Sequence, residues 1–142
     1  MKRIIFNIFI FLFAFILTSN ASSKNNYFDE GKTLFLQKKF SESKFKFEKD
    51  IVYNPKSELS YLYLAKIFHE KKKYNLEEKN LETVILLNPK NEEAIFLLAL
   101  LKIQQSDYSE AEKLIKNFKK ICKNLCKKEE ELNTKLKNLQ TN

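Results

Sequence analysis

The sequence predicts an all-α protein, an α-solenoid of about three antiparallel helix pairs closed by a C-terminal helix. The tripeptide Asn-Pro-Lys occurs at 54–56 and again at 88–90, and it holds both prolines of the 142-residue chain. The two copies lie 34 residues apart, and shifting the chain by the same distance aligns similar side chains in columns. A fixed period of this length, with apolar residues at helical spacing, predicts an array of helical repeats.

The first 21 residues have the layout of a secretory signal peptide. Lys2 and Arg3 precede an apolar run over 4–17, and small polar residues follow up to Ala21, after which we expect cleavage. The alternative is an uncleaved membrane anchor, although the run is shorter than the ~20 residues that a transmembrane helix needs. We therefore expect export to the periplasm or cell envelope, with membrane contact only if the leader is retained.

Three repeat units are expected after the leader, at about 24–57, 58–91 and 92–125. Apolar residues of the second unit stand at i, i+3, i+4 and i+7, which places them on one helix face: Tyr61, Leu64, Ala65 and Phe68. A second stripe of the same kind consists of Tyr108, Ala111, Ile115 and Phe118. Each unit is therefore expected to contain two helices.

The connections between these helices are also visible in the sequence. Short polar turns lie at 37–39, 70–73 and 104–107. Turns this short join the two helices of a unit as an antiparallel hairpin. Proline lacks an amide hydrogen and disfavours the helical conformation of the residue before it, so each Asn-Pro step should end the second helix of its unit.

Residues 126–142 are expected to form a capping helix and a tail. An array of repeats needs a terminal helix to cover its last apolar face. Leucines fall on one side of this segment and charges on the other; they are Leu125, Leu132, Leu136 and Leu139.

The columns of the alignment resemble the tetratricopeptide repeat, over roughly 24–125. Each unit opens with a large residue (Tyr27, Tyr61, Ile95), and a small one follows four positions later (Gly31, Ala65, Ala99). A proline closes each of the first two units. Three residues depart from the family pattern: Asp50 and Glu77 replace small residues, and Lys102 replaces an aromatic one. The resemblance implies a protein-binding scaffold.

In that family the first helices of the units line the concave face, which implies that a protein or peptide partner binds there. Positions one, five and eight after each opening residue are expected to face this groove. They are Phe28, Lys32, Phe35, Leu62, Lys66, His69, Phe96, Leu100 and Ile103. Such a surface suits a segment with apolar anchors and a carboxylate. The alternative is that the cap or a neighbouring chain, as in a homo-oligomer, covers much of it.

No catalytic, cofactor or metal site is expected. His69 is the only histidine and Gly31 the only glycine, which excludes a glycine-rich phosphate loop. Zinc prefers four ligands, and only His69 could join the two cysteines. The protein is therefore not expected to be an enzyme.

Cys122 and Cys126 are expected to form a disulfide, because two cysteines of an exported protein usually bond to each other. Four residues apart on an unbroken helix, their Cβ atoms point in unsuitable directions. The bond therefore requires a helix break, in the stretch where the third unit lacks Asn-Pro. Two reduced thiols in a continuous helix are the alternative.

The mature chain is basic. Without Lys2 and Arg3, the chain has 24 of its 26 basic residues and 18 acidic ones, which gives a net charge of +6. Solvated helix faces account for this excess, and export disfavours a nucleic-acid partner. Two further roles stay open: a structural subunit of an envelope assembly, and a basic module that binds anionic peptides or envelope polymers. Salt dependence of binding separates them.

Overall fold

The structure, a computed structural model, describes residues 26–140, which form seven helices and no strand. The helices are α2 (Tyr27–Leu36), α3 (Phe40–Tyr53), α4 (Glu58–Glu70), α5 (Tyr74–Leu87), α6 (Glu92–Gln104), α7 (Tyr108–Ile121) and α8 (Lys128–Gln140). The predicted all-α solenoid is confirmed. The predicted leader, residues 1–21, lies outside the described residues. Within 26–140, every helix is too short or too polar to cross a membrane.

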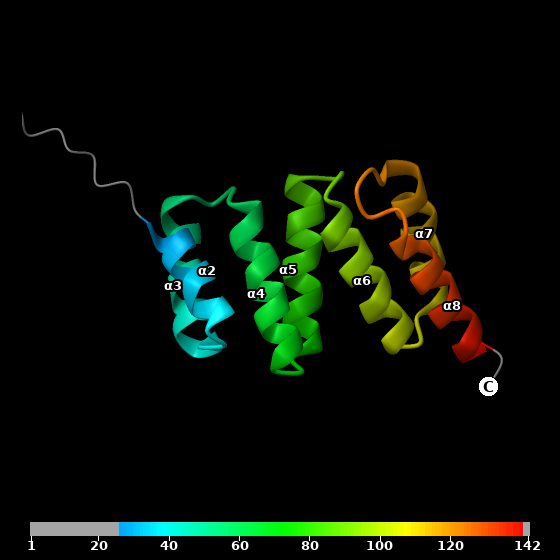
Figure 1. Cartoon of the computed structure of the whole chain (residues 1–142), viewed down its shortest axis with the longest axis horizontal. Coiled ribbons are helices and arrows are strands. Elements are labelled where there is room, and N and C mark those ends of the chain that lie inside the picture. The colour runs from blue at the N-terminus through cyan, green and yellow to red at the C-terminus, as the bar shows by residue number, and fades with distance from the viewer. Residues whose placement is uncertain (1–25, 141–142) are drawn as a thin grey trace, which may run out of the picture.

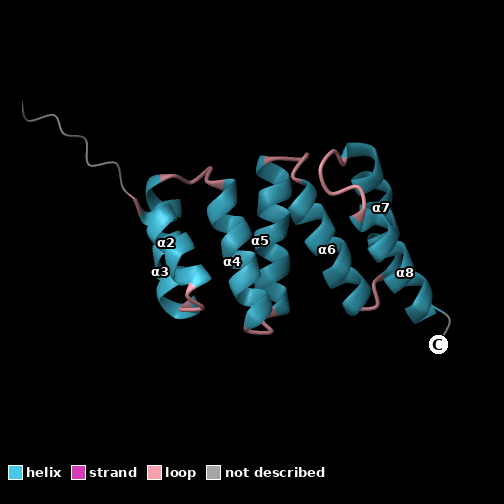
Figure 2. Ribbon diagram, viewed as in Figure 1, coloured by secondary structure: helices cyan, strands magenta, loops and turns pink. Residues whose placement is uncertain are grey.

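The helices stand side by side in a row, with α2 and α3 at one end and α7 and α8 at the other (Figure 1). The first and second helices of each unit pack together as α2 with α3, α4 with α5, and α6 with α7. The units join through α3 against α4 and α5 against α6, and α8 packs against both α6 and α7. Short turns connect the successive helices (Figure 2). The cap thus occupies the place where a fourth unit would begin.

The hairpin turns of the three units have the same backbone geometry. Lys38, Lys72 and Ser106 adopt positive φ angles of 59°, 54° and 63°, and they stand 34 residues apart in the sequence. Each donates its amide hydrogen to the carbonyl three residues earlier, at distances of 2.9, 2.8 and 3.1 Å. A left-handed residue after a helix is a common way to close its last turn. The sequence repeat is therefore also a backbone repeat.

Helix ends follow the sequence signals. Both α3 and α5 end directly before an Asn-Pro step. The helices α6 and α7 begin with side-chain caps, since Asn91 accepts from the amide of Ala94 and Asp107 from that of Glu110. Such caps satisfy amides that have no partner within the helix.

The core contains the residues of the predicted stripes. One cluster joins the second unit, the third unit and the cap, and a smaller one joins the first unit to α4. Leu132 and Leu136 of α8 are buried, whereas Leu139 is 47% exposed. Leu139 lies one helical turn beyond Leu136, which is the last residue of the core cluster.

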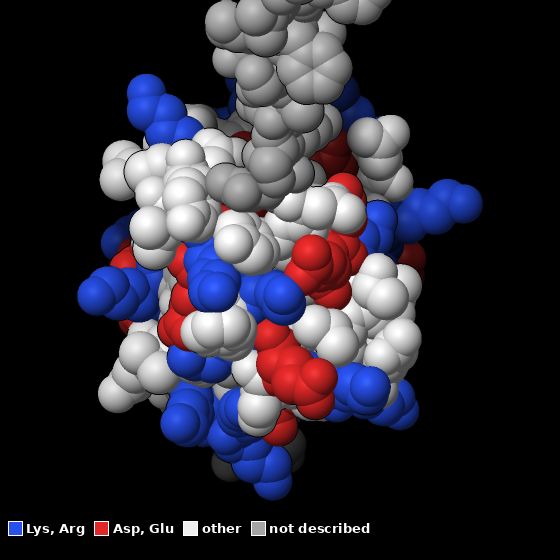
Figure 3. Space-filling model, turned by 90° about the vertical axis from the view of Figure 1, so that its left-hand side faces the viewer, with Lys and Arg blue, Asp and Glu red and all other residues white. Residues whose placement is uncertain are grey.

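Charges of both signs cover the surface at the α2–α3 end. Figure 3 shows Lys and Arg side chains interspersed with Asp and Glu on this face, with uncharged residues between them. Lys46 of α3 pairs with Glu30 of α2 across the first unit. This end of the solenoid therefore lacks a continuous field of one sign among its described residues.

Candidate functional site

A cavity of about 480 Å³ lies among α4, α6 and α8. Because α4 and α6 are the first helices of their units, this cavity lies on the face that first helices form, and the cap supplies its third wall. Its lining residues are His69, Leu100, Ile103, Gln104, Lys135, Asn138 and Leu139. The lining thus combines apolar side chains, amides and basic groups, and contains no carboxylate.

Three of the nine residues predicted for partner binding meet at this cavity: His69, Leu100 and Ile103. The wall formed by Lys135, Asn138 and Leu139 was missed in the sequence, where residues 126–142 were treated only as a cover for the core. The amphipathic pattern of the cap held the signal, because Lys135 and Leu139 flank the buried Leu136.

The prediction of an open apolar surface along the first helices is wrong for part of the set. Leu62 and Ile103 are 3% exposed and Phe96 is 8% exposed, all within the larger core cluster. The ring of Phe96 packs near Phe118, with centroids 6.1 Å apart, and Lys128 at the start of α8 lies over it at 5.2 Å. The cap therefore covers this position, as the alternative interpretation allowed.

The two predicted aromatic residues of α2 pack around Tyr63, a residue of α4 that sequence reasoning did not identify. Ring centroids of Phe28, Phe35 and Phe47 lie 5.9, 5.1 and 5.0 Å from that of Tyr63. Both Phe28 and Phe35 are consequently half-buried. They hold the first unit against the second, which leaves only their outer edges for a partner.

The two predicted lysines differ in their surroundings. Lys66 pairs with Glu93 of α6 at 2.7 Å, and its Nζ lies 4.9 Å from the centroid of Tyr63. Lys32 is exposed on α2. Lys66 therefore connects the second unit to the third, whereas Lys32 is accessible to solvent.

His69 is held by a buried carboxylate. Its Nδ1 lies 3.0 and 3.1 Å from the two carboxylate oxygens of Glu77, whose side chain is 4% exposed while that of His69 is 56% exposed. Burial raises the pKa of Glu77 above its ordinary value, and pairing with His69 opposes this shift. Glu77 stands where the tetratricopeptide pattern prefers a small residue, so this departure brings a buried acid to the cavity's histidine. In the sequence, the only indication of this contact is that the two residues lie on either side of the same hairpin turn.

The other two departures from the repeat pattern connect neighbouring units. Asp50 of α3 is buried and accepts a hydrogen bond of 2.5 Å from the hydroxyl of Ser60 on α4. Lys102 of α6 pairs with Glu78 of α5 at 2.6 Å. Hydrogen bonding within this pair raises the pKa of Lys102 and lowers that of Glu78. Polar replacements thus occur where one unit meets the next.

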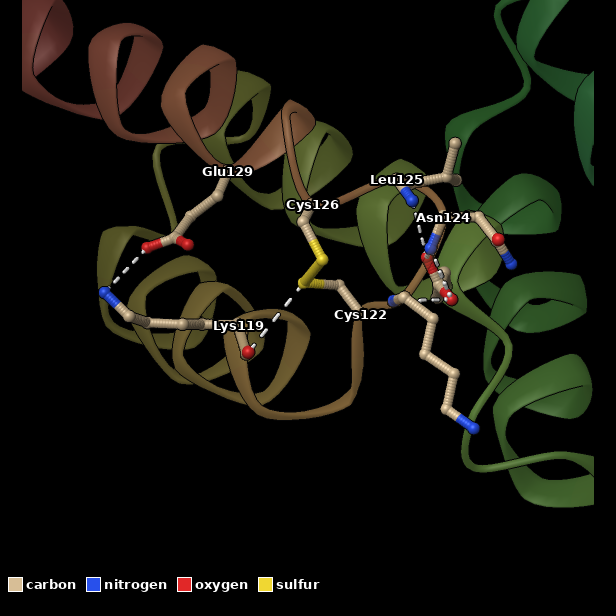
Figure 4. The surroundings of a disulfide bond; sticks show 8 residues. Lys119, Cys122, Asn124, Leu125, Cys126 and Glu129 are labelled. Atoms are coloured by element: carbon tan, nitrogen blue, oxygen red, sulfur yellow. Dashed lines mark hydrogen bonds and ion pairs between the residues drawn. A yellow bond between two sulfur atoms is a disulfide. The ribbon is translucent and has the colours of Figure 1, made fainter.

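The cap is attached by a short disulfide loop. The structure joins Cys122 and Cys126, whose Cα atoms lie 5.2 Å apart, in the break between α7 and α8 (Figure 4). This is the helix break that the sequence argument required. Lys119 and Glu129, on the two flanking helices, form an ion pair of 3.1 Å beside the bond. The loop fixes the direction in which the cap leaves the third unit.

Glu92 at the start of α6 holds the same loop. Its carboxylate accepts hydrogen bonds from three consecutive backbone amides, residues 123–125, at 2.8 to 3.3 Å. These bonds lower the pKa of Glu92. One repeat earlier, Glu58 accepts from the side-chain amide of Asn88, beside the second Asn-Pro step. The disulfide loop therefore takes the place of the missing Asn-Pro turn.

No group of three or more histidine, cysteine or acidic residues that could hold a metal ion occurs within 26–140.

No protein-family model matches this sequence, and no curated protein matches it either. Several solved structures, however, are similar to this chain. The type III secretion chaperone SycD of Yersinia enterocolitica, in complex with a peptide of the translocator YopD, superposes with a TM-score of 0.74 at 12% identity, covering 87% of this chain and 97% of that one. The TPR2B domain of yeast Sti1, in its complex with pHsp70, superposes with a TM-score of 0.71 at 15% identity, covering 77% of this chain and 91% of that one.

A third similar structure is the second TPR domain of human RPAP3, in complex with the HSP70 peptide SGPTIEEVD. It has a TM-score of 0.67 and 16% identity, covering 81% of this chain and 92% of that one. At such identities the likeness concerns the fold. Three helix pairs with identical turns, followed by a capping helix, thus give this chain the tetratricopeptide-repeat fold.

Proposed function

We propose that this protein is an exported tetratricopeptide-repeat scaffold that binds a protein partner, by taking a peptide segment of it into the cavity between α4, α6 and α8. The observation that supports this most directly is the composition of that cavity. Leu100 and Leu139 provide apolar contact, while amide and basic groups on the same lining can orient a backbone or a carboxylate.

The solved structures of the same fold support the class of function. SycD, the Sti1 domain and the RPAP3 domain were each determined in complex with a partner or a partner's peptide. Export is part of the proposal, and the layout of the leader supports it. An uncleaved leader that anchors the chain in a membrane is the alternative location.

Site-specific photo-crosslinking tests the location of binding. Gln104→p-benzoylphenylalanine places the probe on the cavity lining, and Lys79→p-benzoylphenylalanine places it on the exposed outer side of α5 as a matched control. We expect defined protein adducts in the envelope fraction from position 104 and none from position 79. Adducts from position 79 alone would move the site to the outer wall.

A second candidate function is the binding of anionic polymers. Lys116 and Lys120 on the outer side of α7, and Lys127 between the disulfide and α8, are exposed. Charge-led binding weakens as salt screens the charges. If this function is the correct one, capture by an anionic polymer such as heparin will fall steeply with salt and will be lost in the triple variant Lys116→Gln, Lys120→Gln, Lys127→Gln.

A further inference from the structure

We propose that the segment bound in the α4–α6–α8 cavity is acidic, and that His69, positioned by Glu77, makes its binding depend on pH. This inference rests on the proposed function, because it names the partner chemistry of the same cavity. It follows from the charges on the lining and from the hydrogen bond that holds the histidine.

The lining favours an acidic segment with an apolar side chain. Among its residues the only charged or chargeable groups are Lys135 and His69, both basic. A carboxylate beside an apolar anchor can pair with Lys135 while the anchor contacts Leu100 and Leu139. A segment with lysine or arginine at that place would face like charges. The charge complementarity therefore selects one class of peptide.

The contact with Glu77 determines which nitrogen of His69 can meet a ligand. An ionised carboxylate only accepts hydrogen bonds, so Nδ1 of His69 donates to Glu77 and Nε2 remains for a ligand. In the neutral ring Nε2 has a lone pair and repels a carboxylate oxygen. In the protonated ring Nε2 donates a charged hydrogen bond, and Glu77 supplies the counter-charge. Acidic ligands therefore bind together with a proton, and their affinity falls as pH rises.

The titratable and charged groups around His69 come from α4, α5 and α8. From α5 it meets Glu77 and, with ring centroids 6.5 Å apart, Tyr74. The lining residues of α6 are uncharged, and α8 presents Lys135 on the opposite wall. On α4 itself the neighbouring charges are Glu70, the next residue, and Lys66, which pairs with Glu93. His69 is also the only histidine of the chain, and histidine is the side chain that most often serves as a switch near physiological pH.

The test begins with a random heptapeptide phage library selected on the purified protein at about pH 6. We expect enriched peptides to have Asp or Glu next to Leu, Ile, Val, Met or Phe. Fluorescence anisotropy of the most enriched peptide then gives its Kd at about pH 6 and about pH 8. We expect binding to be about two- to fivefold weaker at the higher pH, the effect of one solvent-accessible ion pair.

Three variants separate the proposed roles. His69→Gln should abolish the difference between the two pH values, and it should fold normally because the side chain is more than half exposed. Lys135→Gln should weaken binding at both pH values and leave their ratio unchanged. Lys79→Gln, which removes the same charge from the outer side of α5, should change neither.

Two results would overturn the inference while leaving the proposed function intact: enriched peptides without acidic residues, or a pH effect that persists in His69→Gln. If Lys135→Gln and Lys79→Gln behave alike, the acidic class of segment is likewise excluded and the proposed function is untouched. If no peptide is enriched, the cavity is not a peptide site, and the proposed function fails as well.

Discussion

Replacing Gly31 with alanine tests the close approach of the first two helices. A Cβ atom at this position would lie 2.9 Å from Cε1, 3.0 Å from Cδ1 and 3.1 Å from Cζ of the Phe47 ring. Phe47 is fully buried between the rings of Phe28 and Tyr63, at 5.8 and 5.0 Å. The hydroxyl of Ser43 also donates to the carbonyl of Gly31 at 2.8 Å, which fixes the two helices relative to each other. The ring therefore has little room to move.

Two opposing free energies determine the result. Overpacking of a well-filled core costs about 1–3 kcal/mol. Alanine in place of glycine within a helix contributes about 1 kcal/mol of stability. We therefore expect Gly31→Ala to lower the free energy of unfolding by about 1 kcal/mol. In a Phe47→Leu background the ring is absent, so the same change should raise it by up to about 1 kcal/mol.

Urea denaturation followed by far-UV circular dichroism gives the four free energies of this double-mutant cycle. Ala65→Gly, at the equivalent position of the second unit, is the matched control and should cost about 1 kcal/mol, because glycine is the poorer helix former. If Gly31→Ala stabilises the protein in both backgrounds, the ring yields freely. The close helix approach would then not be the reason for glycine at this position.

Three further predictions concern charge, redox state and processing. The raised pKa of Glu77 means that the folded state binds its proton more tightly than the unfolded state, so the free energy of unfolding should fall as pH rises above about 4.5. Glu77→Ala should reduce this slope in urea denaturation at several pH values; an unchanged slope contradicts the assignment. In protein isolated under oxidising conditions, Cys122 and Cys126 should react with iodoacetamide only after reduction, whereas two thiols labelled without reductant would exclude the bond. Intact mass of the exported protein should correspond to a chain that begins at Ser22, and a mass that includes residues 1–21 would favour the membrane anchor.

The sequence was sufficient for the arrangement of helices along the chain. Each hairpin turn, each Asn-Pro step and each apolar stripe depends on local conformational preferences and on helical spacing, which are properties of a few consecutive residues. The break between Cys122 and Cys126 was predictable for the same reason, because in an unbroken helix the two Cβ atoms point in directions that do not suit a disulfide.

Which first-helix residues line the groove depends on how far each unit rotates against the next. Local spacing in the sequence does not determine that rotation. That rotation follows from the sum of side-chain contacts between units, such as those of Tyr63 with Phe28 and Phe35. It decides that Leu62 and Phe96 are covered while His69 faces a cavity. His69 and Glu77 lie on the two helices of one unit, so their contact depends on how those two helices pack.

The sequence by itself determined the repeat, the helix faces and the places where helices end, because these depend on the chemistry of neighbouring residues. Only the tertiary structure decided which first-helix positions remain accessible, and that Glu77 meets His69 across a hairpin at 3.0 Å. It also decided that Glu92 holds the disulfide loop through the amides of residues 123–125. These contacts join residues whose approach is set by packing between helices, and no local preference of either residue specifies the other.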